Sequence, residues 1–197
     1  MAAGEGMSLA IATLELFDEK AGRLSELSLA QDILKSYRAS VEWVRGQPWT
    51  GEYSGPTGEA VDAYILTLRM LIRDNEPISL RNMRRLYREA PIPATLADQF
   101  EQACAELNTF LDADTNLAIE EGRQLTHRDI FEVFVYGSLA HTNSLRNREI
   151  FIALRDGAWF PLFQALFADC LRAFEVVLAS LRRINATALA ELRAARS

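Results

Sequence analysis

The spacing of apolar residues near the C-terminus constrains the fold more than any other feature of the sequence. These residues alternate at intervals of four and three across more than three heptads, at Phe163, Phe167, Cys170, Phe174, Val177, Leu181, Ile184 and Ala188. Residues at such intervals share one face of an α-helix, and a face of this length needs a helical partner that covers it. The sequence therefore predicts a long C-terminal helix with a heptad pattern. An ordinary bundle presents the same pattern, which favours a partner helix in the same chain over one in a second chain.

Similar apolar stripes recur along most of the chain and predict further amphipathic helices. Two helix starts are well marked. Ser79 is one expected cap, and the residues Ile78 and Met83 on either side of the first turn are spaced as a hydrophobic staple. Thr126 and Asp129 have the spacing of a capping box. No stretch shows the alternating pattern and paired runs that predict strands.

The length of 197 residues favours one domain. Residues 1–7 are expected to form a flexible segment or a cloning remnant, and residues 8–197 a single all-α bundle of about seven to eight helices. Before the C-terminal helix, the stripes and caps predict helical segments near residues 14–24, 28–46, 57–76, 79–90, 95–122, 126–140 and 145–157.

Charge and composition narrow the classes of function. The formal net charge of −6 disfavours a protein built wholly around a polyanion, although it is compatible with a local basic patch. No run approaches the ~20 apolar residues of a membrane span, and the N-terminus lacks the pattern of a secretory signal. Cys104 and Cys170 occupy apolar helical positions, as reduced core thiols do. These features predict a cytoplasmic protein without a membrane partner.

A cluster of polar residues follows the apolar run of residues 130–140. His141 and Asn143 lie at the end of this run, and Arg146 and Arg148 follow within two helical turns. An imidazole beside two guanidiniums and an amide has the groups needed to bind a phosphate and to move a proton. In the alternative interpretation, His141 hydrogen-bonds a backbone carbonyl or a neighbouring helix, as buried polar groups usually do.

Four arginines lie on the short helix expected at residues 79–90, and their spacing places most of them on one side of it. They are Arg81, Arg84, Arg85 and Arg88. Such a group attracts phosphate, nucleic acid or an acidic partner. The alternative is a solvated surface that serves only solubility.

The longest expected loop, residues 46–58, carries the aromatic residues Trp49 and Tyr53. A loop of this kind can act as a lid or as a hook that binds a partner. In the alternative interpretation, which is the more common one, the aromatic rings fold back and cover the core.

The sequence contains none of the common enzyme signatures, such as a glycine-rich phosphate loop or a nucleophile elbow. Asp112, Asp114 and Asn116 imitate the start of a calcium loop. However, Leu117 stands where that loop needs glycine, and Arg123 stands where it needs glutamate. We therefore expect no metal site and no cofactor.

Taken together, these patterns favour a non-enzymatic helical interaction module that acts as a homodimer or as a subunit of a larger assembly. The alternative is a helical RNA-binding or RNA-cleaving protein that uses His141 with Arg146 and Arg148. A third hypothesis is a small-molecule sensor whose ligand lies in the apolar bundle beside Gly137.

Overall fold

The computed structural model describes residues 2–26, 67–72, 74–118, 124–135 and 160–196. The chain divides into two compact units. The first contains Met1–Leu27, Thr67–Asn108 and Phe174–Ser197, and the second contains Ser28–Leu66 and Thr109–Ala173. The prediction of one domain over residues 8–197 stays a prediction.

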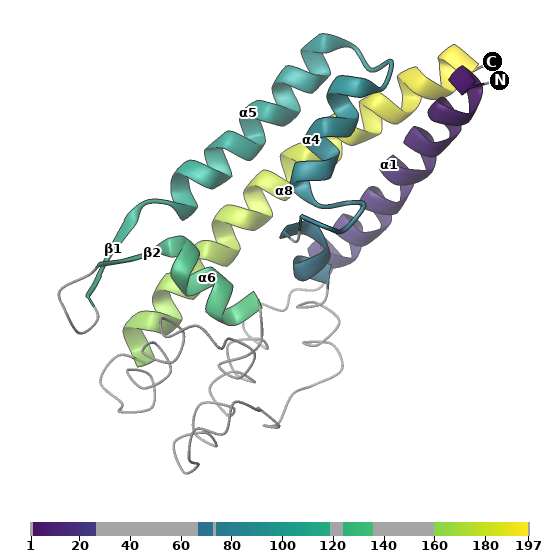
Figure 1. Cartoon of the computed structure of the whole chain (residues 1–197). Helices are drawn as coiled ribbons and strands as arrows, with labels where there is room; N and C mark the ends of the chain where they lie inside the picture. The colour runs from purple at the N-terminus through teal and green to yellow at the C-terminus, as the bar shows by residue number, and fades with distance from the viewer. Residues whose placement is uncertain (1, 27–66, 73, 119–123, 136–159, 197) are drawn as a thin grey trace. The chain divides into compact units, whose positions relative to one another are not determined.

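Most of the described residues are helical (Figure 1). The helices are α1 (Ala2–Glu26), α4 (Leu80–Glu89), α5 (Ala94–Leu111), α6 (His127–Val135) and α8 (Phe160–Arg196), and residues 67–72 are helical as well. Within the described residues this makes six helical segments, so the predicted count of seven to eight is not reached there. Helix α1 begins at Ala2 and includes residues 2–7, for which the sequence predicts a flexible segment. None of the described helices has the length and apolar composition of a membrane span.

The first unit is built around the C-terminal part of α8. Helix α1 runs antiparallel to it, since Glu15 pairs with Arg193 and Asp18 pairs with Arg182. The two chain ends accordingly lie side by side (Figure 1). The buried side chains of this unit include Leu14, Phe17, Ala21, Met83, Tyr87, Phe100, Cys104, Leu107, Leu181, Ala188 and Leu192. Helices of the same chain therefore cover this part of the heptad face, as the sequence predicts.

The buried face of α8 departs from the predicted heptad positions near its C-terminal end. Ile184 is only half buried, whereas Asn185 has 0% of its surface exposed. A straight α-helix has 3.6 residues per turn, so a strict 3.5-residue pattern drifts by about 20° per heptad. This drift brings position 185 into the core in place of position 184, and residue 185 is an asparagine.

The Asn185 side chain is the polar centre of the first unit. Its Nδ2 donates to the backbone oxygen of Leu14 at 2.9 Å, and its Oδ1 accepts from the Tyr87 hydroxyl at 3.3 Å. One side chain of α8 thus joins α1 and α4, which lie far away in the sequence. Satisfied buried groups of this kind restrict how the helices can slide along one another.

Helix α4 forms where its local signals predict. The Ser79 hydroxyl accepts a hydrogen bond from the Asn82 backbone nitrogen at 3.2 Å, and Ile78 and Met83 are both buried. This cap satisfies one of the free donors of the first turn. The helix ends at Glu89, shortly before Pro91.

The second unit adds a small two-stranded sheet to the predicted all-α fold. Helix α5 ends at Leu111 instead of continuing toward residue 122. Strands β1 (Asp114–Ala118) and β2 (Gln124–Thr126) follow it and pair antiparallel. The buried Thr115 hydroxyl donates to the Leu125 backbone oxygen at 2.6 Å and accepts from the Leu117 nitrogen at 3.2 Å. Aspartate, asparagine and threonine are weak helix formers, and here cross-strand pairing offers their backbone other partners.

Candidate interaction surface

Several predicted site residues lie outside the part of the chain that the structure describes. They are His141, Asn143, Arg146 and Arg148 of the phosphate-binding hypothesis, Trp49 and Tyr53 of the aromatic loop, and Gly137 of the ligand-binding hypothesis. The hypotheses that depend on them stay predictions. The arginines of α4 are the predicted site that the structure describes in full.

These four arginines have different environments, and Arg84 faces α5. Its Nε donates to Glu101 Oε2 at 2.9 Å, and its Nη2 forms an ion pair with Glu101 Oε1. The hydrogen bond from Arg84 lowers the pKa of Glu101, and the same bond raises the pKa of Arg84. Arg88 reaches the same carboxylate, with Nη2 2.7 Å from Oε2. Glu101 therefore holds α4 against α5.

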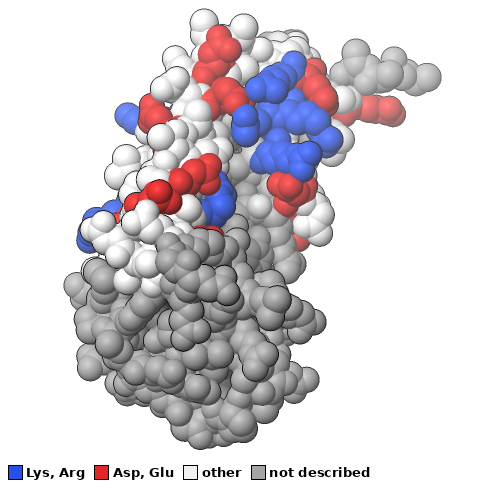
Figure 2. All heavy atoms as spheres, turned by 60° about the vertical axis from the view of Figure 1, so that its left-hand side comes forward, with Lys and Arg blue, Asp and Glu red and all other residues white. Residues whose placement is uncertain are grey.

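The other three arginines, Arg81, Arg85 and Arg88, form an exposed row along α4 at intervals of four and three residues. The Arg81 side chain is 72% exposed and pairs with Asp74 at 2.6 Å, and that of Arg88 is 64% exposed. Arg85 has no ion-pair partner within the described residues. Figure 2 shows one large patch of Lys and Arg side chains on the visible face, bordered by Asp and Glu side chains, with a few other Lys and Arg side chains elsewhere. Ion pairs this exposed contribute about 0–1 kcal/mol, so an incoming anion can replace them.

Replacing Glu101 with glutamine should lower the free energy of unfolding by about 0.5–1 kcal/mol near pH 7, because the pair with Arg84 is partly exposed. The folded-state pKa of Glu101 is lowered, so its contribution is present above the unfolded-state pKa and is lost as the pH falls through the folded-state value. Urea unfolding of both proteins near pH 7 and near pH 3 measures this difference. Glu191→Gln on α8 is the control, since Glu191 is exposed and forms no ion pair among the described residues. A Glu101→Gln deficit that is no smaller at the lower pH would contradict this account.

A groove of about 620 Å³ lies between α5 and α8 in the first unit. Its α5 wall contains Asp98, Gln102 and Glu106, and its α8 wall contains Ser180, Arg183, Ile184 and Thr187. Buried Ala103 and half-buried Ile184 supply its apolar surface. Asp98 forms no ion pair within the described part of the chain. The groove thus has room for polar side chains of another molecule.

This groove was not predicted from the sequence. A signal was present, because Asp98, Gln102 and Glu106 recur every four residues on α5, away from the buried stripe that contains Phe100 and Cys104. A polar row of this kind is also typical of an ordinary solvated helix face. Only the neighbouring wall of α8 makes it one side of a groove.

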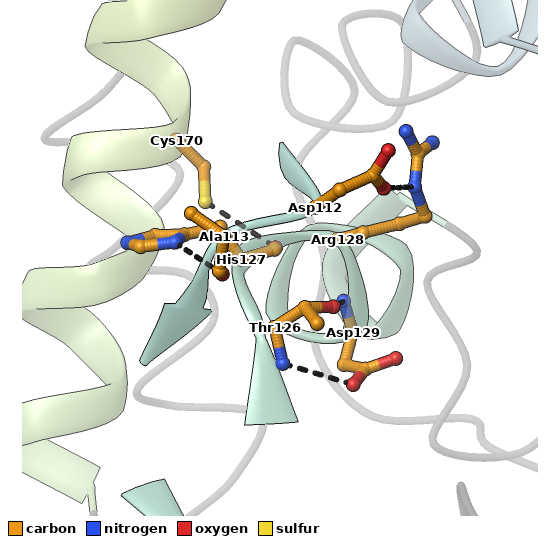
Figure 3. Close-up of polar contacts among 7 residues, drawn as sticks. All are labelled: Asp112, Ala113, Thr126, His127, Arg128, Asp129 and Cys170. Carbon is orange, nitrogen blue, oxygen red and sulfur yellow. Dashed lines mark hydrogen bonds and ion pairs between the residues drawn. The ribbon is translucent and has the colours of Figure 1, made fainter. Parts of the chain in front are cut away.

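The start of α6 forms a second polar cluster, in the second unit (Figure 3). Its predicted capping box is confirmed: Asp129 N donates to Thr126 Oγ1 at 3.2 Å, and Thr126 N donates to Asp129 Oδ2 at 3.0 Å. The His127 ring lies against Phe110, with ring centroids 4.5 Å apart, and its Nδ1 is 3.0 Å from the Ala113 oxygen. These contacts hold the imidazole at the base of the hairpin.

Cys170 contacts the same cluster through its thiol, which donates to the His127 backbone oxygen at 3.5 Å (Figure 3). Burial raises the pKa of Cys170 to about 12, and burial likewise raises the pKa of Cys104 to about 12. Both thiols are therefore protonated at neutral pH and lack the thiolate that a cysteine nucleophile needs. Among the described residues, no group of three or more His, Cys, Asp and Glu is placed to hold a metal ion.

Comparison of the chain with protein-family models, with curated proteins and with solved structures gave no match.

Proposed function

We propose that this protein is a non-enzymatic helical interaction module, which acts as a homodimer or as a subunit of a larger assembly. Its binding surface is the exposed row Arg81, Arg85 and Arg88 on α4, and its partner presents an acidic protein surface. The observation that carries the proposal is the different use of the four arginines. Arg84 pairs with Glu101, whereas Arg85 is exposed and forms no ion pair among the described residues.

The row suits carboxylates of a folded partner. Arginine presents its donors in a planar fork that binds a carboxylate through two parallel hydrogen bonds. From Arg81 to Arg88 the helix rises by about 10 Å, which spans two turns of a partner helix. Because the row belongs to a capped helix that Glu101 holds against α5, its backbone is already ordered before binding.

A long nucleic acid fits this surface less well. Tight binding to a phosphate backbone usually rests on many simultaneous phosphate contacts. The row supplies three arginines, and the carboxylates of Asp74 and Glu101 lie next to them. A polyanion that extended beyond the row would meet these carboxylates, whereas a compact acidic surface would not. This contrast favours a protein partner.

The test measures the binding of a labelled glutamate-rich peptide to the full chain by fluorescence anisotropy at low salt. We expect Arg85→Glu to weaken binding about tenfold or more, since it replaces an attraction with a repulsion. Arg196→Glu is the matched control, because it changes the net charge equally at an exposed site on another helix. Equal loss in both variants would show that only net charge matters and would overturn the proposal. Tighter, Arg85-dependent binding of a single-stranded RNA of equal charge would assign the row to nucleic acid instead.

A further inference from the structure

We infer that the acidic surface bound by the arginine row is the α5–α8 groove of a second copy of this chain. The inference rests on the proposed function, because it names the partner of the same row. Its basis is that one compact unit presents both a cationic row and a groove with carboxylates, and that each holds a charge without an ion-pair partner among the described residues. These charges are Arg85 in the row and Asp98 in the groove.

The two surfaces match in length and in charge. Asp98 and Glu106 lie two turns apart on α5, which corresponds to a rise of about 12 Å. Arg81 and Arg88 are separated by a rise of about 10 Å on α4. Between the two carboxylates, Gln102 donates to Glu106 at 3.0 Å and keeps the groove wall polar. The carboxylate row and the arginine row are therefore of similar length, and in the inferred contact Arg85 lies opposite Asp98.

The groove also contains a cation, Arg183, on its α8 wall. The Arg183 guanidinium donates to Ser180 on the same helix at 3.2 Å. With two carboxylates and one guanidinium, the groove carries one excess negative charge, and its acidic residues belong to the α5 wall. The arginine row of the second copy would therefore lie along α5.

The position of α5 allows both contacts to form at once. Glu101 joins α5 to α4 through Arg84 and Arg88, and the groove opens on the other side of the same helix. A two-fold rotation about an axis beside α5 would place each row on the other copy's groove. Such an interface is self-complementary and closed, as in most homodimers. Ala105 is an exposed α5 residue outside the groove lining, and its methyl side chain leaves room for a close approach.

The test measures the mass of the full chain by sedimentation velocity from about 1 to about 100 µM, a range that covers micromolar affinities. We expect a dimer that weakens as the salt concentration rises, because its contacts are partly exposed charge pairs. Arg85→Glu and Asp98→Arg should each weaken self-association about tenfold or more. Both positions are exposed, so thermal unfolding of each variant should stay close to that of the unaltered chain.

Mixing the two variants gives the decisive result. In a mixed dimer, the new glutamate of one copy faces the new arginine of the other, and the second contact is Arg85 with Asp98, as in the unaltered protein. Recovery of a dimer in the mixture supports the inference. An unaltered chain that stays monomeric throughout this range, or a mixture that stays monomeric, would overturn it. If the monomer still binds the glutamate-rich peptide through Arg85, the proposed function stands with another partner, and if it does not, both fail.

Discussion

Replacing Phe100 with alanine should lower the free energy of unfolding by about 3–5 kcal/mol, as is typical for a large aromatic side chain in a core. Phe100 is fully buried and joins three helices. Its ring stacks on Tyr87 of α4, with centroids 4.3 Å apart, and contacts Phe17 of α1 edge-on at 6.2 Å. Truncation removes both aromatic contacts and leaves a cavity that helices of a close-packed bundle fill only in part.

Thermal and urea unfolding measure this effect. For a chain of this size, a loss of 1 kcal/mol lowers the melting temperature by about 2–4 °C, so we expect a decrease of about 6–20 °C. Leu9→Ala on α1 is the matched control, because Leu9 is 68% exposed. Its substitution should change the stability by less than about 0.5 kcal/mol. A Phe100→Ala change as small as that of Leu9→Ala would mean that the rings of Phe17, Tyr87 and Phe100 do not form the core of this unit.

Replacing Asn185 with aspartate should lower the free energy of unfolding by about 3 kcal/mol or more near pH 7. The substitution has nearly the same shape, but it removes the amide donor that Leu14 accepts from and places a carboxylate against that carbonyl. A buried, unpaired charge is costly, and the hydroxyl of Tyr87 compensates for only part of it. Burial would raise the pKa of the new carboxyl, so the loss should increase as the pH rises through its unfolded-state pKa.

Urea unfolding between about pH 4 and pH 7 tests this prediction, since an ordinary aspartate titrates near the lower value. Asn185→Leu is a second variant that separates charge from packing. It removes the hydrogen bonds without adding a charge, so its stability should show no comparable dependence on pH. A similar pH dependence in both variants would mean that the new carboxylate is not buried between α1 and α4.

Signals within a few residues of one another predicted helix starts correctly. Ser79 caps α4, and Thr126 with Asp129 caps α6, as their spacing indicates. A cap involves a side chain and backbone groups within one turn, so its geometry depends little on the rest of the chain. The same applies to the buried positions of α1, where Leu14, Phe17 and other apolar residues lie on the predicted face.

The hairpin after α5 shows where local signals were insufficient. Thr115 and Leu117 are buried while their neighbours are exposed, but this two-residue alternation spans only the five residues of β1. Its partner strand β2 has three residues. Segments this short resemble the end of a helix in sequence. They become strands only by pairing with each other, and that pairing depends on residues from another part of the chain.

The sequence by itself determined the helical class, several helix starts and the apolar faces, because each follows from periodicity and capping within one segment. It also identified the arginines of α4 as a group. Only the tertiary structure decided that Arg84 binds Glu101 while Arg85 stays exposed, and that Asn185 instead of Ile184 enters the core. Neighbouring residues on a helix have similar local signals, and the packing of α1, α4, α5 and α8 selects which of them is buried.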